Sequence, residues 1–281
     1  MRAKGRFFMI KYDRYVGGKR YAATFSYDDG GAADRRLVGL FNKYNMKCTF
    51  NLISSSLIKT DGTGIKTAEL KDLYAGHEIA CHSYSHPHLE RMSVQDQYDE
   101  LIRDRQIIEG ATGRIIRGLA YPFGTYNTDT TFTAMKTASL VYGRTATSTG
   151  TFELPADFRI WNPTTHHNEC EPFVKKFKYN VEKAIWRAGG VLYIWGHSYE
   201  FDNKDYPVQW DKFDEILASL AEDADGIWFA TNIEIYDYVN ALKALRRSAD
   251  GKTFCNPTDT DLWISVDDQP LKIPKISTVT I

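Results

Sequence analysis

Apolar and polar residues alternate along the chain with two periods, one typical of strands and the other typical of helices. The short β-prone run 21–25 and the apolar run 191–195 predict buried strands. Apolar residues recur at helical spacing at Leu37, Leu40, Phe41 and Tyr44 and predict a helix. Ser93 and Asp96 have the spacing of a capping box and predict the start of another helix. Strand-like and helix-like segments therefore alternate over most of the chain.

Repeated strand–helix units are typical of an α/β fold with a parallel sheet and helical crossovers. The pattern does not choose between an open doubly wound sheet and a barrel. In both folds, functional side chains lie at the carboxyl ends of the strands. Four polar clusters follow predicted strands: residues 28–29, His82, residues 121–122 and His197. We expect them to converge on one mouth of the sheet.

The two ends of the chain are expected to differ from this central region. Residues 1–20 are interpreted as an N-terminal extension and residues 21–245 as the catalytic domain. In residues 246–281, apolar and polar positions alternate from 262 to 266. This alternation predicts a short β extension packed on the main domain rather than a second domain.

Composition narrows the range of partners. The net charge of −1 argues against a nucleic-acid binder, and no apolar run approaches the ~18 residues of a membrane-spanning helix. Four widely separated cysteines without a C-x-x-C pair argue against a zinc knuckle. No signal peptide is recognisable, so the expected location is cytoplasmic for the sequence as written, or extracellular if a signal has been removed.

Two histidines and two adjacent aspartates are the candidate chemical groups. His82 and His86 have H-x-x-x-H spacing, and Pro87 favours a loop around them. That spacing alone also fits two surface or core histidines, and an Asp-Asp-Gly triplet alone also fits a turn. Asp28 and Asp29 point in different directions, so one can bind a metal while the other accepts a proton. Two histidines and one carboxylate suit Zn²⁺ with an open position for water, which the ion would acidify.

Four segments carry a recognisable set of motifs. Residues 24–30 read TFSYDDG, residues 76–86 read GHEIACHSYSH, residues 121–124 read YPFG and residues 192–197 read LYIWGH. In this order they resemble the polysaccharide deacetylases of the NodB-homology type, carbohydrate esterase family 4. The second motif is the longest and most specific match. The resemblance covers roughly residues 20–240 and implies an irregular (β/α) barrel of fewer than eight units.

The resemblance also implies a role for each matching residue. Asp28 would be the general base, His197 the general acid, and the backbone N–H of Phe123 would help to stabilise the oxyanion. The metal ligands would be Asp29, His82 and His86. The expected substrate-binding residues are Tyr121, Pro122, Trp161, Leu192, Ile194 and Trp195. The last three would form the pocket for the acetyl methyl group, while Trp161 fits either sugar stacking or core packing.

Two departures from the family pattern are informative. The arginine that often begins the third motif and bonds to the catalytic aspartate is replaced by Ala120, and Arg144 is the candidate to compensate. The fourth motif, an Asp-Trp element whose acid orients the catalytic histidine, is only loosely resembled by Asp157 with Trp161. Glu200 and Glu234 are rival acids for that position.

The leading hypothesis is a metal-dependent hydrolase that removes acetyl groups from a carbohydrate, either an N-acetylglucosamine-type polymer or acetylated xylan. One alternative is a metal-dependent amidohydrolase acting on a small non-polysaccharide amide. Another is a non-catalytic carbohydrate-binding protein. Zn²⁺ is the expected cofactor, although Co²⁺, Ni²⁺ or Mn²⁺ would suit the same ligands. The sequence does not give the oligomeric state.

Overall fold

The computed structural model describes residues 8–57, 64–183 and 189–281, and its centre is a parallel sheet of eight strands. The strands are β2 (Tyr21–Asp29), β3 (Thr49–Leu52), β4 (Glu78–Cys81), β5 (Gly118–Ala120), β6 (Tyr142–Arg144), β7 (Thr165–His166), β8 (Gly190–His197) and β9 (Ile227–Phe229). Their order is β6-β5-β4-β3-β2-β8-β7, with β9 beside the first part of β2. The central strands β2 and β8 are buried along nearly their whole length, as parallel strands covered on both faces must be.

The two outer parts of this sheet meet through the segment around Trp161 and Thr164. Next to β6, the Trp161 N–H donates to Gly143 O (2.9 Å), and Trp161 O accepts from the Thr145 N–H (3.1 Å). On the other side, the Thr164 N–H donates to Tyr193 O of β8 (2.9 Å). The sheet therefore curls into an irregular (β/α) barrel, which confirms the expected fold class.

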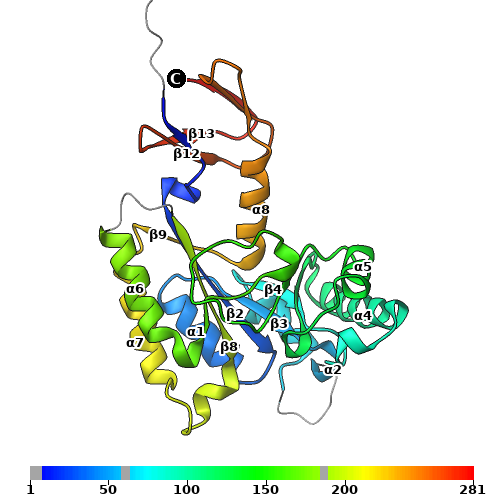
Figure 1. Ribbon diagram of the computed structural model, residues 1–281. Coiled ribbons are helices and arrows are strands. Elements are labelled where there is room, and N and C mark those ends of the chain that lie inside the picture. The colour runs from blue at the N-terminus through cyan, green and yellow to red at the C-terminus, as the bar shows by residue number, and fades with distance from the viewer. Residues whose placement is uncertain (1–7, 58–63, 184–188) are drawn as a thin grey trace, which may run out of the picture.

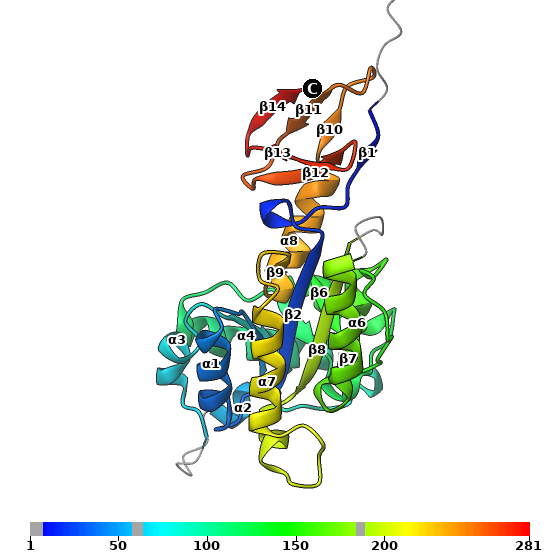
Figure 2. The same ribbon diagram turned by 90° about the vertical axis from the view of Figure 1, so that its left-hand side faces the viewer.

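Helices cover the outside of the barrel (Figures 1 and 2). They are α1 (Asp34–Lys43), α2 (Ser54–Leu57), α3 (Leu70–Leu73), α4 (Val94–Thr112), α5 (Thr130–Thr137), α6 (Cys170–Lys183), α7 (Trp210–Ala221) and α8 (Asn232–Lys243). The expected start of α4 is confirmed, because Ser93 Oγ accepts from the Asp96 N–H at 3.2 Å. The spacing of residues 173–188 predicts a helix that corresponds to α6, but residues 184–188 lie outside the described ranges.

Some strand boundaries differ from the sequence prediction. β2 was expected to stop at residue 25, before the aspartates, yet it runs to Asp29 because Asp28 and Asp29 pair with residues of β3. The apolar run 140–142 predicts a strand, but β6 begins at Tyr142, so Arg144 ends the strand instead of following it. Pairing with neighbouring strands sets these limits, and a local hydrophobic pattern does not contain that information.

The two ends of the chain together build a small β module. It contains β1 (Ile10–Lys11), β10 (Arg246–Arg247), β11 (Thr253–Asn256), β12 (Leu262–Val266), β13 (Gln269–Ile273) and β14 (Ser277–Thr280). These strands form two antiparallel sheets, β1-β12-β13 and β10-β11-β14, around the buried Phe254, Ile264 and Ile273. The module stands on α8 at the end of the barrel where β2 begins (Figures 1 and 2). It is larger than the expected short extension, because β1 supplies an N-terminal strand.

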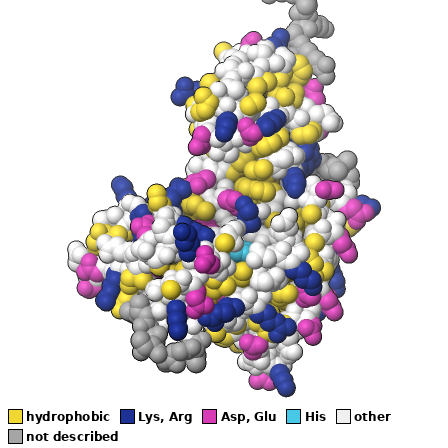
Figure 3. Space-filling view, turned by 180° about the vertical axis from the view of Figure 1, so that it is seen from behind, with side chains coloured by type: hydrophobic (Ala, Val, Ile, Leu, Met, Phe, Trp, Pro, Cys, Tyr) yellow, Lys and Arg dark blue, Asp and Glu magenta, His cyan; other side chains and the backbone are white. Residues whose placement is uncertain are grey.

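The surface carries mixed charge. On the face shown in Figure 3, positive and negative side chains are interspersed, and hydrophobic side chains gather at the neck between module and barrel. Within the described ranges, no helix has the length and apolarity needed to span a membrane.

Candidate metal centre and active site

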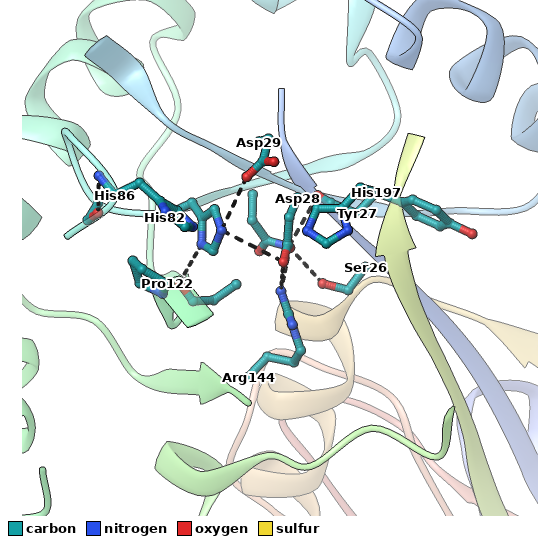
Figure 4. Close-up of polar contacts among 12 residues, drawn as sticks. Ser26, Tyr27, Asp28, Asp29, His82, His86, Pro122, Arg144 and His197 are labelled. Atoms are coloured by element: carbon teal, nitrogen blue, oxygen red, sulfur yellow. Dashed lines mark hydrogen bonds and ion pairs between the residues drawn. The ribbon is translucent and has the colours of Figure 1, made fainter. Parts of the chain in front are cut away.

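Asp29, His82 and His86 come together at the carboxyl ends of the strands. Asp29 ends β2, His82 directly follows β4, and His86 lies in the loop after it. One ligand atom from each residue lies within 4.8 Å of the other two, and His82 Nε2 is 3.5 Å from Asp29 Oδ1 (Figure 4). The three expected metal ligands therefore form one cluster.

The backbone around this cluster has an unusual conformation. Asp29, Ser83 and His86 all have positive φ angles (78°, 61° and 59°), which residues with side chains seldom adopt. The His86 N–H donates to Ser83 Oγ at 3.0 Å, and this turn brings the His86 ring to 4.7 Å from the His82 ring, centroid to centroid. The segment is a loop, as Pro87 indicated. Such strain concentrates at functional sites.

Hydrogen bonding fixes which nitrogen of His82 is free. Nδ1 lies 2.8 Å from Ala120 O, and because a carbonyl only accepts, Nδ1 carries the hydrogen. The lone pair of a neutral ring is then on Nε2, which faces Asp28 Oδ2 at 3.7 Å and Asp29 Oδ1 at 3.5 Å. Neither distance is a hydrogen bond. A buried lone pair next to two carboxylates is an environment that a cation satisfies, so the residues fit a divalent metal.

Asp28 is a buried carboxylate with several charged or polar partners. It is 3% exposed, pairs with the Arg144 guanidinium and accepts from Asn51 Nδ2 at 2.8 Å. Burial raises the pKa of Asp28, but Arg144, His82 and His197 outweigh burial and hold the pKa below its usual value. Asp28 is therefore an ionised group that can accept a proton.

Arg144 reaches Asp28 from β6, whereas the family pattern places the arginine on β5, at the position of Ala120. Ala120 in β5 and Arg144 in β6 are direct register partners, so the guanidinium enters the barrel at the same level from one strand further on. It is 1% exposed and lies over the Trp195 ring, 4.6 Å from the centroid. The contact between Arg144 and Asp28 that we predicted is present (Figure 4).

His197 lies across from the aspartates, and its nearest carboxylate is Glu200. In the β2–β8 register His197 is the partner of Asp28, and its Nδ1 lies 3.3 Å from Glu200 Oε1. Burial lowers the pKa of His197, but Glu200, Asp28 and Asp29 outweigh burial and raise it above its usual value. Protonated His197 is therefore favoured, as a proton donor requires.

The Asp157–Trp161 assignment to the fourth motif was wrong. Asp157 pairs with Arg159 at 2.6 Å and accepts from the backbone at the start of a 3₁₀ helix, away from His197. Glu234 pairs with Lys47 and caps α8. Of the three acids considered, Glu200, three residues after His197, is the one that lies next to its ring.

Strand alternation separates the residues expected to form the methyl pocket. Leu192 and Ile194 are fully buried in the hydrophobic core outside the barrel. Trp195 and His197 point to the opposite side of β8, and their rings lie 5.7 Å apart. Leu192 and Ile194 are therefore core residues, and only Trp195 of the three remains at the site.

Most of the other expected substrate contacts are also packing residues. Tyr121 is 1% exposed, and its hydroxyl donates to Arg159 O (2.7 Å). Trp161, 1% exposed, packs in the barrel interior, and Pro122 is buried. Phe123 instead is 53% exposed, with a φ of 59° and its ring next to the metal cluster.

Two supporting residues were not singled out from the sequence. Asn51 binds Asp28, and Asp104 of α4 accepts from the His82 N–H at 3.0 Å. Both have a recognisable signal, because each is a polar residue at a position where the surrounding pattern predicts an apolar one. Asn51 interrupts the run 48–53, and Asp104 lies on the same helix face as Leu101.

Sequence comparison matches residues 16–142 to the family model described as polysaccharide deacetylase. Among curated proteins, the peptidoglycan-N-acetylglucosamine deacetylase PgdA of Listeria monocytogenes is 28% identical over 109 residues. That match covers 39% of this chain and 22% of the relative, so the similarity spans about a fifth of the relative's length.

Solved structures agree on the fold. A Mycobacterium smegmatis protein described as a polysaccharide deacetylase superposes with a TM-score of 0.62 at 17% identity, covering 82% of this chain and 93% of the other. Peptidoglycan deacetylase PdaC from Bacillus subtilis superposes with a TM-score of 0.52 at 20% identity, covering 80% and 94%. Residues 16–142 therefore match the polysaccharide deacetylase family, and the barrel as a whole has the fold of these solved structures.

Proposed function

We propose that this protein is a metal-dependent hydrolase that removes acetyl groups from a carbohydrate. The observation that supports it most is the His82 lone pair facing Asp28 and Asp29 without a hydrogen between them. Asp29, His82 and His86 would hold a divalent ion, with Zn²⁺ as the first choice for this N/O donor set. Such an ion polarises an acyl carbonyl and acidifies water.

The remaining residues supply proton transfer and orientation. Asp28 would take a proton from the attacking water, with Arg144 and Asn51 holding the carboxylate in place. His197, on the neighbouring strand, would give a proton to the departing amine or alcohol. The backbone N–H of Phe123 would stabilise the oxyanion. Trp195 would border the acyl group.

Names of two relatives favour one substrate class. PgdA is a peptidoglycan-N-acetylglucosamine deacetylase and PdaC a peptidoglycan deacetylase, so we propose an N-acetylated glucosamine unit of a glycan as the substrate. The bond broken would then be the amide, and an amine leaving group depends on protonation by the general acid. Acetylated xylan and small amides are the alternative substrates for the test.

Acetate release tests this function. Purified protein would be assayed with chito-oligosaccharides, peptidoglycan fragments and acetylated xylan, with and without chelator, and metal content would be measured on the same sample. We expect chelator-sensitive release from the first two substrates, and none from Asp28→Asn protein that retains its metal. Release from xylan alone would contradict the amide assignment. Absence of bound metal after Zn²⁺ or Co²⁺ is added would contradict the ligand set.

A further inference from the structure

Glu200 lies at the centre of three histidines. Its Oε1 is 3.3 Å from His197 Nδ1, while its Oε2 is 3.1 Å from His166 Nε2 and 3.2 Å from His167 Nε2. Burial raises the pKa of Glu200, but His166 and His197 outweigh burial and bring it far below its usual value. Glu200 is therefore an ionised carboxylate surrounded by possible N–H donors.

Packing fixes the position of His167. Its fully buried ring lies between Tyr27 and Phe201, with centroids 5.7 Å and 4.3 Å away and interplanar angles of 15° and 21°. Its Nδ1 edge abuts Gly196, where a Cβ atom would come within 2.0 Å. Burial lowers the pKa of His167 to about 3, so the ring is neutral. With its position fixed, Nε2 is the edge that faces Glu200.

The tautomer of His166 distinguishes two uses of this cluster. His166, His167 and Glu200 have the composition of a second metal site. However, His166 Nδ1 accepts from the Asn168 N–H at 3.3 Å, which places the hydrogen of a neutral ring on Nε2, the atom facing Glu200. A metal ligand needs a lone pair at that atom. The ring is therefore arranged to donate to Glu200, and its edge also contacts Trp195 (centroids 4.8 Å apart).

We propose that Glu200 is the positioning residue for His197 and that His166 and His167 hold it in place. Glu200 would bind the Nδ1 side of His197, so that Nε2 is directed at the leaving group. This proposal rests on the proposed function, because it assigns His197 the role of proton donor. It also gives a use to the adjacent histidines at positions 166 and 167.

Glu200→Gln removes the charge and keeps the shape. We expect kcat to fall about 10- to 100-fold with little change in KM or metal content. The basic limb of the kcat/KM profile should move to lower pH, because the charge of Glu200 would no longer favour protonated His197. Asp157→Asn, at the acid that most resembled the family motif, is the control and should change neither kcat nor the basic limb. Unchanged kcat and basic limb in Glu200→Gln would overturn the proposal.

Two substitutions at His166 separate positioning from folding. The amide of Gln can donate where Nε2 does, whereas Leu cannot, so His166→Gln should recover much of the kcat lost in His166→Leu. Thermal unfolding of both variants monitors folding. Equal losses of kcat in the two variants, with equal melting temperatures, would contradict a donor role.

Nuclear magnetic resonance of the histidine side chains tests the network without activity. In ¹⁵N-labelled metal-loaded protein, we expect the midpoint of the His197 titration to fall in Glu200→Gln. This result is independent of acetate release, so it separates failure of the network from failure of the deacetylase function. A wild-type protein that binds two equivalents of Zn²⁺ and loses one in His166→Leu would overturn the proposal in favour of a second metal site.

Discussion

At the scale of single residues, the site consists of charges removed from water and paired with one another. Asp28 and Arg144 are both nearly inaccessible, and Asn51 completes the hydrogen bonding of the carboxylate. A buried ion pair adds little net stability, but loss of one partner leaves an uncompensated charge. Arg144 is therefore expected to be essential even though it does not touch the metal ligands.

Arg144→Met is expected to destabilise the protein by about 3–5 kcal/mol, because Asp28 loses its counter-ion in a buried position. The double variant Arg144→Met with Asp28→Asn should recover much of that stability without recovering activity. Denaturant unfolding of wild type, both single variants and the double variant measures this coupling. Additive effects of the two substitutions would contradict a direct pair.

Glu78, on β4, is a second buried carboxyl group with a different role. It accepts from the Tyr142 hydroxyl, Thr49 Oγ1 and the Ile233 N–H at 2.8, 2.8 and 2.9 Å. Burial nevertheless raises the pKa of Glu78 from 4.5 to about 7. The folded state therefore holds a proton that the unfolded state has released. The stabilising contribution of this proton is complete below pH 4.5 and is lost as the pH rises through 7.

Glu78→Gln should therefore gain stability relative to wild type as the pH rises from 5 to 8, by up to about 3 kcal/mol. The difference in unfolding free energy between the two proteins, measured across this range, tests the sign. The exposed Glu215→Gln serves as control and should give a flat difference. A difference for Glu78→Gln that falls with pH would contradict the assignment.

At the scale of elements, β8 connects the core and the site. Its alternation directs Leu192 and Ile194 to the outer core, and Trp195 and His197 to the mouth. Gly196 faces the same side of β8 as Leu192 and Ile194, and His167 packs against the strand at this position. A side chain at this position would occupy the space of the ring that supports Glu200.

Gly196→Ala is expected to cost about 1–3 kcal/mol through overpacking and to lower kcat while the metal is retained. Gly39→Ala is the matched control, because a Cβ atom at Gly39 of α1 meets nothing within 4 Å. That substitution should instead stabilise the helix by about 0.5–1 kcal/mol. Urea unfolding and metal analysis measure both variants. If the two variants showed the same change in unfolding free energy, His167 would be free to move away from the added Cβ atom.

At the scale of the whole molecule, the β module closes the end of the barrel opposite the site. Leu262 of β12 is fully buried in a cluster that also contains Ala22, Val191 and Tyr238. These residues belong to β2, β8 and α8, so one side chain of the module packs into a cluster built from the barrel strands. The module is therefore expected to unfold together with the barrel.

Leu262→Ala should lower the stability of the protein by about 2–5 kcal/mol in a single transition, with unchanged metal content. Ile276→Ala, at a 70% exposed position in the same module, is the control and should have no effect. Calorimetry separates the possibilities. A second, independent transition that alone shifts in Leu262→Ala would show that the module and barrel are separate folding units.

The sequence by itself determined the strand–helix alternation, the cluster of Asp29, His82 and His86, and the start of α4. The alternation and the helix start depend on local spacing. The cluster forms because β2 and β4, on either side of β3, are parallel and carry the ligands to the same edge of the sheet. Tertiary structure alone decided that Glu200 and not Asp157 faces His197, and that β1 pairs with β12. Those outcomes depend on which segments become neighbours after the sheet curls, and that is set by packing across the whole chain rather than by local pattern.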